Sequence, residues 1–363
     1  MKRFKVHLIC LFNFFLLLSC TKPVVTVIGT PKIEAGIAKI TGKVSSPNDS
    51  HKANSFVEMF VTHAISGEIS KYKAVINQSG RFSIDVDVET NIALIALYTS
   101  LKPYNSLLVR VKSGEVTNID ITYNTNLNIE DVKTKPEMNE DDMMQSLPII
   151  NQMHGIYDNV PEPQIPLYDK NPEAYLRYIK TRVSEKSEIL NKDSLLSTEL
   201  KGILAKEFTL WRYTVGAFDY ERSMKFNFQY FVKDSTRMPK IQKIDRSYFG
   251  FLKEFNLNNP QYLICSNFID FQKGMLKNGT LALPEIAQLD IPSWLVIVKA
   301  SLSDVVGFKD GQYYDILAAN AYGRQLNEKV QLTEKQKKNI LDYWKEGEIA
   351  KILLRKNQQV AKR

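Results

Sequence analysis

Cysteine is the residue type in this chain whose chemistry is easiest to anticipate, and there are three of them. Cys10 lies within an apolar run, residues 6–18, that follows a basic segment at residues 2–5. A short basic segment before an apolar segment is the layout of a secretory signal. The run is too short to cross a bilayer, which requires about 20 apolar residues. We therefore expect Cys10 to leave with a cleaved signal.

Cys20 ends this apolar run in the sequence Leu17-Leu18-Ser19-Cys20. The sequence resembles the bacterial lipobox, in which a small residue precedes an invariant cysteine. The resemblance implies a signal peptide over 1–19, acylation of Cys20 and a lipidated tether over 20–36. Several acyl chains hold a protein firmly, since each buried CH₂ contributes about 0.8 kcal/mol. The alternative is an ordinary signal peptide with an accidental cysteine.

The residues after Cys20 bear on where the lipid anchor would be placed. Thr21-Lys22-Pro23 contains no acidic residue. By resemblance to Gram-negative lipoproteins, this indicates an anchor in the outer membrane that faces the periplasm. The expected localisation is the cell envelope, and the expected partner is the membrane, reached through the lipid on Cys20.

Cys265 is the one thiol that would remain free, so no internal disulfide can form. It lies in the apolar stretch QYLICSNFIDF, where a lone cysteine is more often buried and inert than reactive. The alternative is a thiol that forms a mixed disulfide with a partner. The chain has no C-x-x-C sequence.

Other residue types offer little catalytic chemistry. His51, His63 and His154 fall in two predicted domains without a second ligand at metal spacing, so we expect no metal and no cofactor. Sequences typical of a nucleophile elbow, a phosphate loop or a dinucleotide site are absent. The many carboxylates do not define a glycosidase pair without a site to place them in. We therefore expect no enzyme activity from this chain.

One aromatic cluster could line a ligand groove. The segment KFNFQYF (225–231) contributes Phe226, Phe228, Tyr230 and Phe231. At helical spacing such a stripe belongs more often to the core, and both interpretations stay open here.

Length, composition and net charge limit the class of protein to which this chain can belong. The chain has 363 residues, of which 44% are hydrophobic and 10% aromatic, as in a folded protein with about two domains. The net charge is +8, and loss of Lys2, Arg3 and Lys5 with the signal leaves 8 − 3 = +5. The basic residues are scattered apart from the last few, so a nucleic-acid partner is not expected.

Period-two patterning predicts a β-sandwich over 37–125. In NQSGRFSIDVDV (77–88), a turn precedes a strand in which Phe82, Ile84, Val86 and Val88 alternate with polar residues. The apolar run 91–98 suits a central strand, and 106–123 indicates two strands joined by a turn at Ser113-Gly114. Several short strands of this kind are typical of a sandwich.

The remainder divides into an acidic segment and a helical domain. Residues 126–148 are rich in Asp and Glu and are interpreted as a solvated linker, because their spacing does not match a calcium loop. From 149 to 363 the apolar period is helical. Asn171-Pro172 indicates a helix start, Thr333 to Gln336 a capping box, and 247–263 a helix, a turn and a second helix. The predicted fold class is α+β: an N-terminal antiparallel β-sandwich followed by a mostly α-helical domain.

The order of these parts resembles a known family. A lipobox is followed by GRFSI (80–84), by FLKEFNLNNPQYL (251–263) and by the segment 312–358, QYYDILAANAYGRQLNEKVQLTEKQKKNILDYWKEGEIAKILLRKNQ. This resembles the N-terminal region of TlpA-like thiol–disulfide reductase lipoproteins. The resemblance implies a thioredoxin-like domain after the helices, whose W-C-x-x-C performs the redox step. This sequence has no residues that correspond to that pair.

Three functions follow as expectations. The first is a tethered recognition or scaffold module, not catalytic itself, that serves thioredoxin-like disulfide reduction and contacts a thioredoxin-like protein or its clients. The second is a fragment of an intact reductase whose C-x-x-C domain follows residue 363. The third is a lipoprotein that binds a peptide or glycan, which predicts a concave pocket lined by aromatic side chains with no thiol nearby.

Overall fold

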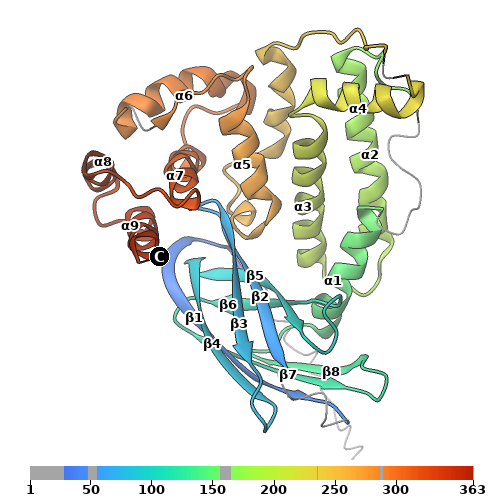
Figure 1. Cartoon of the computed structure of the whole chain (residues 1–363), viewed down its shortest axis with the longest axis vertical. Helices are drawn as coiled ribbons and strands as arrows, with labels where there is room; N and C mark the ends of the chain where they lie inside the picture. The colour runs from blue at the N-terminus through green and yellow to red at the C-terminus, as the bar shows by residue number, and fades with distance from the viewer. Residues whose placement is uncertain (1–27, 48–54, 156–164, 235, 287–288, 363) are drawn as a thin grey trace, which may run out of the picture.

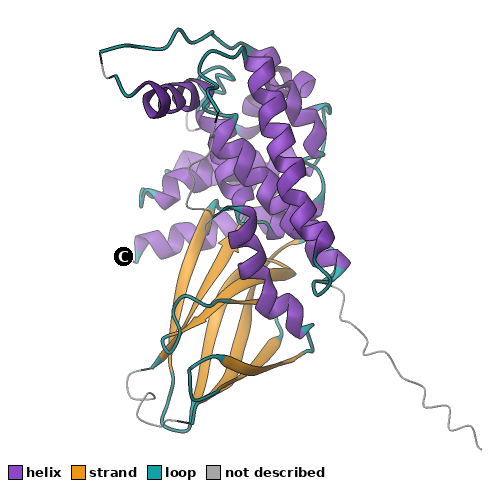
Figure 2. Cartoon of the chain, turned by 90° about the vertical axis from the view of Figure 1, so that its right-hand side faces the viewer, coloured by secondary structure: helices purple, strands orange, loops and turns teal. Residues whose placement is uncertain are grey.

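A computed structural model describes residues 28–47, 55–155, 165–234, 236–286 and 289–362. The predicted signal peptide, Cys20 and His51 lie outside the described residues. Two stacked β-sheets form one part of the molecule, and a group of helices covers one end of them (Figures 1 and 2). The predicted α+β class, a sandwich followed by helices, is confirmed.

The sandwich consists of two four-stranded sheets. Sheet A has the order β4 (Arg81–Thr90), β1 (Ile33–Ser45), β7 (Val116–Tyr123) and β8 (Ile129–Lys135). Sheet B has the order β3 (Glu68–Val75), β2 (Phe56–His63), β5 (Ile92–Thr99) and β6 (Leu107–Lys112). All neighbouring strands are antiparallel except β1 and β7, which run parallel with Lys39 opposite Val116. The expectation of an antiparallel sandwich is therefore correct for every pair but this one.

The strand alternation that the sequence shows determines the sandwich core. Phe82, Val86 and Val88 of β4 are buried between the sheets, while Arg81 and Asp85 are exposed. Side chains at alternate positions of β1, β2, β5, β6 and β7 also belong to this core, because a strand presents alternate residues to its two faces.

The acidic segment 126–148 is not a linker. Its first half forms β8, which pairs with β7, and its second half begins the helix α1 (Glu140–Met153). Asn139 caps α1 by accepting a hydrogen bond from the Asp142 backbone N–H. Acidic residues in the first turn of a helix face the positive end of its dipole, so this composition favours a helix start. The linker prediction is wrong because apolar side chains lie among the charges and are buried, Val132 in β8 and Met143 in α1.

The predicted tether over 20–36 is also too long. Ile28 is buried, and the Ile28 and Gly29 backbone N–H groups donate to the Glu199 carboxylate at 2.6 and 3.0 Å. β1 begins at Ile33. The chain is thus part of the folded unit from residue 28, because a buried apolar side chain and two hydrogen bonds hold it there.

The helical part follows α1. Its elements are α2 (Pro172–Lys192), α3 (Thr198–Gly216), α4 (Tyr220–Val232), the 3₁₀ helices η2 (Arg246–Phe255) and η3 (Pro260–Ile264), α5 (Asn267–Lys277), α6 (Ile291–Val306), α7 (Gln312–Asn327), α8 (Glu334–Trp344) and α9 (Glu348–Ala361). The cap at Asn171 and the capping box of Thr333 and Gln336 are confirmed. The two helices expected over 247–263 are 3₁₀ helices, separated by Asn256 in the left-handed conformation and by the Asn259-Pro260 step.

The turn between β2 and β3, residues 64–67, is buried in the helical part. The Asn320 amide of α7 donates to the Ala64 and Ile65 carbonyl oxygens at 2.8 and 3.2 Å, and the Asn327 amide donates to those of Ser66 and Gly67 at 3.0 and 2.9 Å. From the sandwich, the Glu89 carboxylate of β4 accepts hydrogen bonds from the Ile65 and Ser66 backbone N–H groups. Backbone groups in a buried turn require such partners, so this turn joins the two parts.

Gly323 of α7 allows the 64–67 turn to approach this closely. A Cβ atom at Gly323 would lie 2.2 Å from the Ser66 carbonyl oxygen. No side chain other than hydrogen fits at this position without moving the turn.

The helix α9 makes the second connection between the helical part and the sandwich. Arg355 donates to the carbonyl oxygens of Gly36 and Val88 and forms an ion pair with Asp87 at 3.3 Å, while Glu348 accepts from the Ala35 backbone N–H. The C-terminus consequently lies beside the start of β1 (Figure 1).

We predict that Gly323→Ala destabilises the protein by about 1–3 kcal/mol, because the added methyl group overpacks the contact with the 64–67 turn. Urea unfolding followed by circular dichroism measures this difference. Gly202→Ala in α3 is the matched control: nothing lies within 4 Å of its Cβ position. That change should stabilise the protein by about 0.5–1 kcal/mol, since alanine favours a helix over glycine. Equal effects from both substitutions would contradict the close approach.

Candidate binding cleft

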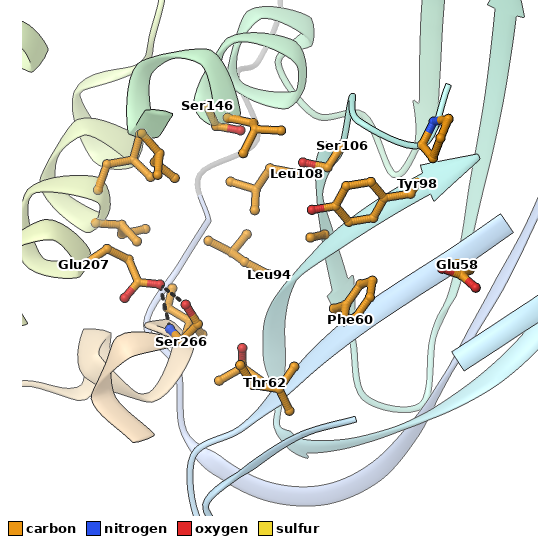
Figure 3. Close-up of a pocket in the computed structure, with 18 of the residues that line it drawn as sticks. Glu58, Phe60, Thr62, Leu94, Tyr98, Ser106, Leu108, Ser146, Glu207 and Ser266 are labelled. Atoms are coloured by element: carbon orange, nitrogen blue, oxygen red, sulfur yellow. Dashed lines mark hydrogen bonds between the residues drawn. The ribbon is translucent and has the colours of Figure 1, made fainter. Parts of the chain in front are cut away.

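A cleft of about 460 Å³ lies between the outer face of sheet B and the helices α1 and α3. Figure 3 shows side chains from both parts pointing into it. The sheet side is lined by Phe56, Glu58, Phe60, Thr62, Ile69, Leu94, Ala96, Tyr98, Thr99, Pro103, Ser106 and Leu108. The helical side is lined by Ser146, Leu147, Ile150, Ile203, Leu204, Glu207, Ile264 and Ser266.

The register of sheet B sets the floor of the cleft. Val57, Met59 and Val61 of β2 point into the sandwich core, so the residues between them point outward. Phe60 lies opposite Ala96 and next to Tyr98, with the Phe60 and Tyr98 rings edge to face at 5.6 Å. The outer face therefore presents a half-buried aromatic pair instead of the polar residues usual on a solvent-facing sheet.

Charged side chains border the floor of the cleft, but neighbouring groups largely compensate their charges. The Glu58 carboxylate is 2.9 Å from the Lys71 ammonium group. Lys71 also lies 5.7 Å from the centre of the Phe60 ring, and Lys73 lies 3.6 Å from that of Phe56. These cations on β3 lie against the aromatic faces, where the ring quadrupole attracts them.

Glu207 of α3 forms part of the helical wall. Its carboxylate accepts hydrogen bonds from the Ser266 backbone N–H at 2.7 Å, the Ser266 hydroxyl and the Asn267 backbone N–H at 2.9 Å. It thus caps α5, whose own N-cap side chain makes no capping bond. Burial nevertheless raises the pKa of Glu207 above its usual value, against the lowering effect of these hydrogen bonds.

His63 and His154, the histidines in the described part of the chain, have different surroundings. His63 is buried with its Nδ1 3.8 Å from the Glu89 carboxylate, and His154 stacks on Trp211 at 4.1 Å between ring centres. Burial lowers the pKa of His154. Among the described residues, no group of three or more His, Cys, Asp or Glu side chains could hold a metal ion.

Cys265 is fully buried, although its neighbours Ile264 and Ser266 line the cleft. The thiol contacts the Gln261 carbonyl oxygen at 3.5 Å. Burial, and then the nearby Glu207 charge, raises the pKa of the thiol well above its usual value. A thiolate is the nucleophile in disulfide exchange, so this geometry agrees with the expectation of a buried cysteine and does not support the alternative of a partner thiol.

The aromatic cluster of α4 is divided between core and surface. Phe228 is buried with its ring edge to face against Tyr168 at 5.1 Å, and Phe231 is half-buried. Phe226 and Tyr230 are 60% and 40% exposed. None of the four lines the cleft, so the cleft gives no support to the alternative that this stripe forms a ligand groove.

The sequence contains a signal for this cleft that period-two patterning alone does not reveal. In FVEMFVTH (56–63), apolar residues occupy both faces of the strand instead of one. Such a pattern indicates a strand covered on both sides. What covers the outer face depends on α1 and α3, which are distant in sequence.

Comparison with known proteins adds no assignment. The chain matches no protein-family model, and neither a curated protein nor a solved structure matches it. The resemblance to TlpA-like lipoproteins therefore remains a prediction that rests on the quoted segments. Within the described part of the chain, no helix has the length and apolar character needed to cross a membrane.

We predict that the Cys265 thiol is unreactive in the folded protein. In a chain of residues 21–363 it is the only thiol. Reaction with a chromogenic disulfide reagent at pH 8 should be at least about 100-fold slower in buffer than in denaturant, because a buried, protonated thiol must first be exposed. Fast reaction in buffer would restore the partner-thiol hypothesis.

We predict a specific pH dependence for Glu207→Gln. A raised pKa means that the folded state holds this proton more tightly than the unfolded chain does, so the carboxyl contributes stability that is lost as the pH rises through its folded pKa. The stability of the wild type relative to Glu207→Gln should therefore fall as the pH rises above the usual range of a glutamate carboxyl. Urea unfolding at several pH values tests this. For the exposed Glu221, whose pKa is lowered by Lys225, Glu221→Gln should not reproduce this trend.

Proposed function

We propose that this protein is a non-catalytic recognition module that binds extended, largely apolar peptide segments of other proteins in the cleft between sheet B and the helices. The observation that carries the proposal is the half-buried pair of Phe60 and Tyr98 on the outer face of the sheet, at the floor of the cleft.

The size and lining of the cleft suit a peptide segment. Its volume is within the range of about 300–1,000 Å³ that is usual for ligand sites. Aromatic rings supply most of the energy when an apolar side chain is bound, since each buries a large area at small entropic cost. The hydroxyl groups of Thr62, Ser106 and Ser146 lie along the walls and offer hydrogen bonds to peptide groups.

The electrostatics favour a peptide over a charged metabolite. Glu58 is already paired with Lys71, and Glu207 is occupied in capping α5. A small anion or cation would find no uncompensated partner among these groups. A neutral apolar segment requires none.

This function agrees with what the family resemblance implies. A lipid-anchored module that serves disulfide reduction must hold unfolded or partly folded clients, and such clients expose apolar segments. The redox step would be performed elsewhere, by a C-x-x-C domain that belongs to a partner or follows in the chain. Attachment through Cys20 to the outer membrane is part of the same proposal.

We predict that the full-length protein binds reduced, carboxymethylated lactalbumin, which is permanently unfolded and exposes many apolar segments. Phe60→Ser should weaken this binding at least about 10-fold, or about 1.4 kcal/mol, because it removes the floor of the cleft. Fluorescence anisotropy of the labelled lactalbumin measures the affinity.

Phe226→Ser is the matched control, because it removes an exposed phenylalanine from α4, outside the cleft. It should leave the affinity unchanged, and both variants should keep the wild-type melting temperature within a few degrees. Equal loss in the two variants, or binding that survives Phe60→Ser, would rule out the cleft as the peptide site.

A further inference from the structure

A second, smaller pocket of about 200 Å³ lies beside the cleft and shares Ser106 and Leu147 with it. It is formed by the loop between β5 and β6, the turn between β7 and β8, and one side of α1. Its lining differs in kind from that of the cleft: one tyrosine, three asparagines and an apolar floor.

Tyr104 is the most exposed large apolar or aromatic side chain in the described part of the chain, at 88%. A single exposed ring on a surface requires no explanation. Tyr104 differs because it borders a pocket in which Asn105, Asn128 and Asn151 also take part. An aromatic face beside several side-chain amides combines an apolar platform with hydrogen-bond donors and acceptors.

Local hydrogen bonds hold this pocket in shape without a ligand. The Asn124 side chain accepts from the backbone N–H groups of Asn126 and Asn128 at 2.9 and 3.1 Å, which fixes the turn between β7 and β8. The Asn105 backbone N–H donates to the Lys102 carbonyl oxygen at 3.2 Å, which fixes the loop that carries Tyr104. A preformed site loses little entropy on binding.

The polar groups have remaining capacity for a ligand. The Asn128 side-chain oxygen accepts a hydrogen bond from the Lys102 ammonium group, so its amide N–H groups stay available as donors. Asn105 is exposed, and its amide provides both a donor and an acceptor. The Lys102 ammonium group is the charged member of this network, and the Asn128 side-chain oxygen occupies one of its three donors.

We propose that this pocket binds a single pyranose ring of an N-acetylated sugar. A pyranose presents C–H groups on its face and hydroxyl groups on its edge, which match the Tyr104 ring and the asparagine amides respectively. Ile129, Met144 and Leu147 form the apolar floor, where the methyl group of an acetamido substituent would be buried. A plain glucose unit would leave this floor unfilled.

The proposal is independent of peptide binding in the cleft, although the two sites adjoin. The competing occupant is a longer peptide that continues out of the cleft past Ser106. Its backbone amides could also bond to the asparagines, but they would leave the exposed face of Tyr104 without a ring to stack on.

Saturation-transfer difference NMR on the full-length protein in a sugar-free detergent tests the assignment. With tri-N-acetylchitotriose we expect transfer to the acetyl methyl and ring protons, and much weaker transfer to maltotriose. Tyr104→Ala should reduce the affinity at least about 10-fold. Tyr230→Ala, which removes a 40% exposed tyrosine of α4, is the control and should have no effect.

Three results would overturn the proposal. These are no transfer at 10 mM chitotriose, transfer that is unchanged in Tyr104→Ala, and equal transfer to both sugars. Loss of lactalbumin binding in Tyr104→Ala without any sugar binding would assign the pocket to the peptide instead. Phe60→Ser should leave the sugar signal intact, so failure of the peptide site and failure of the sugar site are distinguishable.

Discussion

The burial of the 64–67 turn among the helices is the constraint on which the rest of the structure depends. Four consecutive carbonyl oxygens of this turn accept from Asn320 and Asn327, and two of its N–H groups donate to Glu89. Each group would cost about 1–3 kcal/mol if it were buried without a partner. The sandwich and the helices therefore cannot shift relative to one another without breaking several bonds together. The two parts behave as one unit, and the position of sheet B relative to α3 is fixed.

The cleft is a consequence of that fixed position. The helices cover only part of the outer face of sheet B: Ile92 and Leu94 of β5, together with Ala64 and Ile65, belong to the helical core. Farther along the same strands, the cleft lies between the sheet and the helices, and Phe60 and Tyr98 are half-buried there. A binding surface formed in this way is rigid on both sides, since one wall is a sheet and the other consists of packed helices. Rigid walls reduce the entropic cost of capturing a flexible chain.

Local signals in the sequence predicted what local physics determines. The alternation of Phe82, Val86 and Val88, the cap at Asn171 and the capping box at Thr333 each depend on neighbours within a few residues, and each is present. Composition is a weaker guide than pattern where the two disagree. Residues 126–148 are acidic, yet they alternate and continue into a helix. The cleft and the pocket at Tyr104 could not be predicted, because each joins segments that are separate in the chain: the lining of the cleft runs from Phe56 to Ser266, and that of the pocket from Tyr104 to Asn151.

The attachment of Ile28 and Gly29 to Glu199 limits how far this protein could reach from a membrane. If Cys20 carries the lipid, seven residues lie between it and Ile28, and the eight Cα-to-Cα steps can extend to at most about 28 Å. That is close to the thickness of the hydrocarbon core of one bilayer. The first turn of α3 would then be held near the lipid surface, and the cleft beside α3 would meet only those chains that pass close to the membrane. The length of the segment between Cys20 and Ile28, as much as the chemistry of the cleft, would then determine which chains are bound.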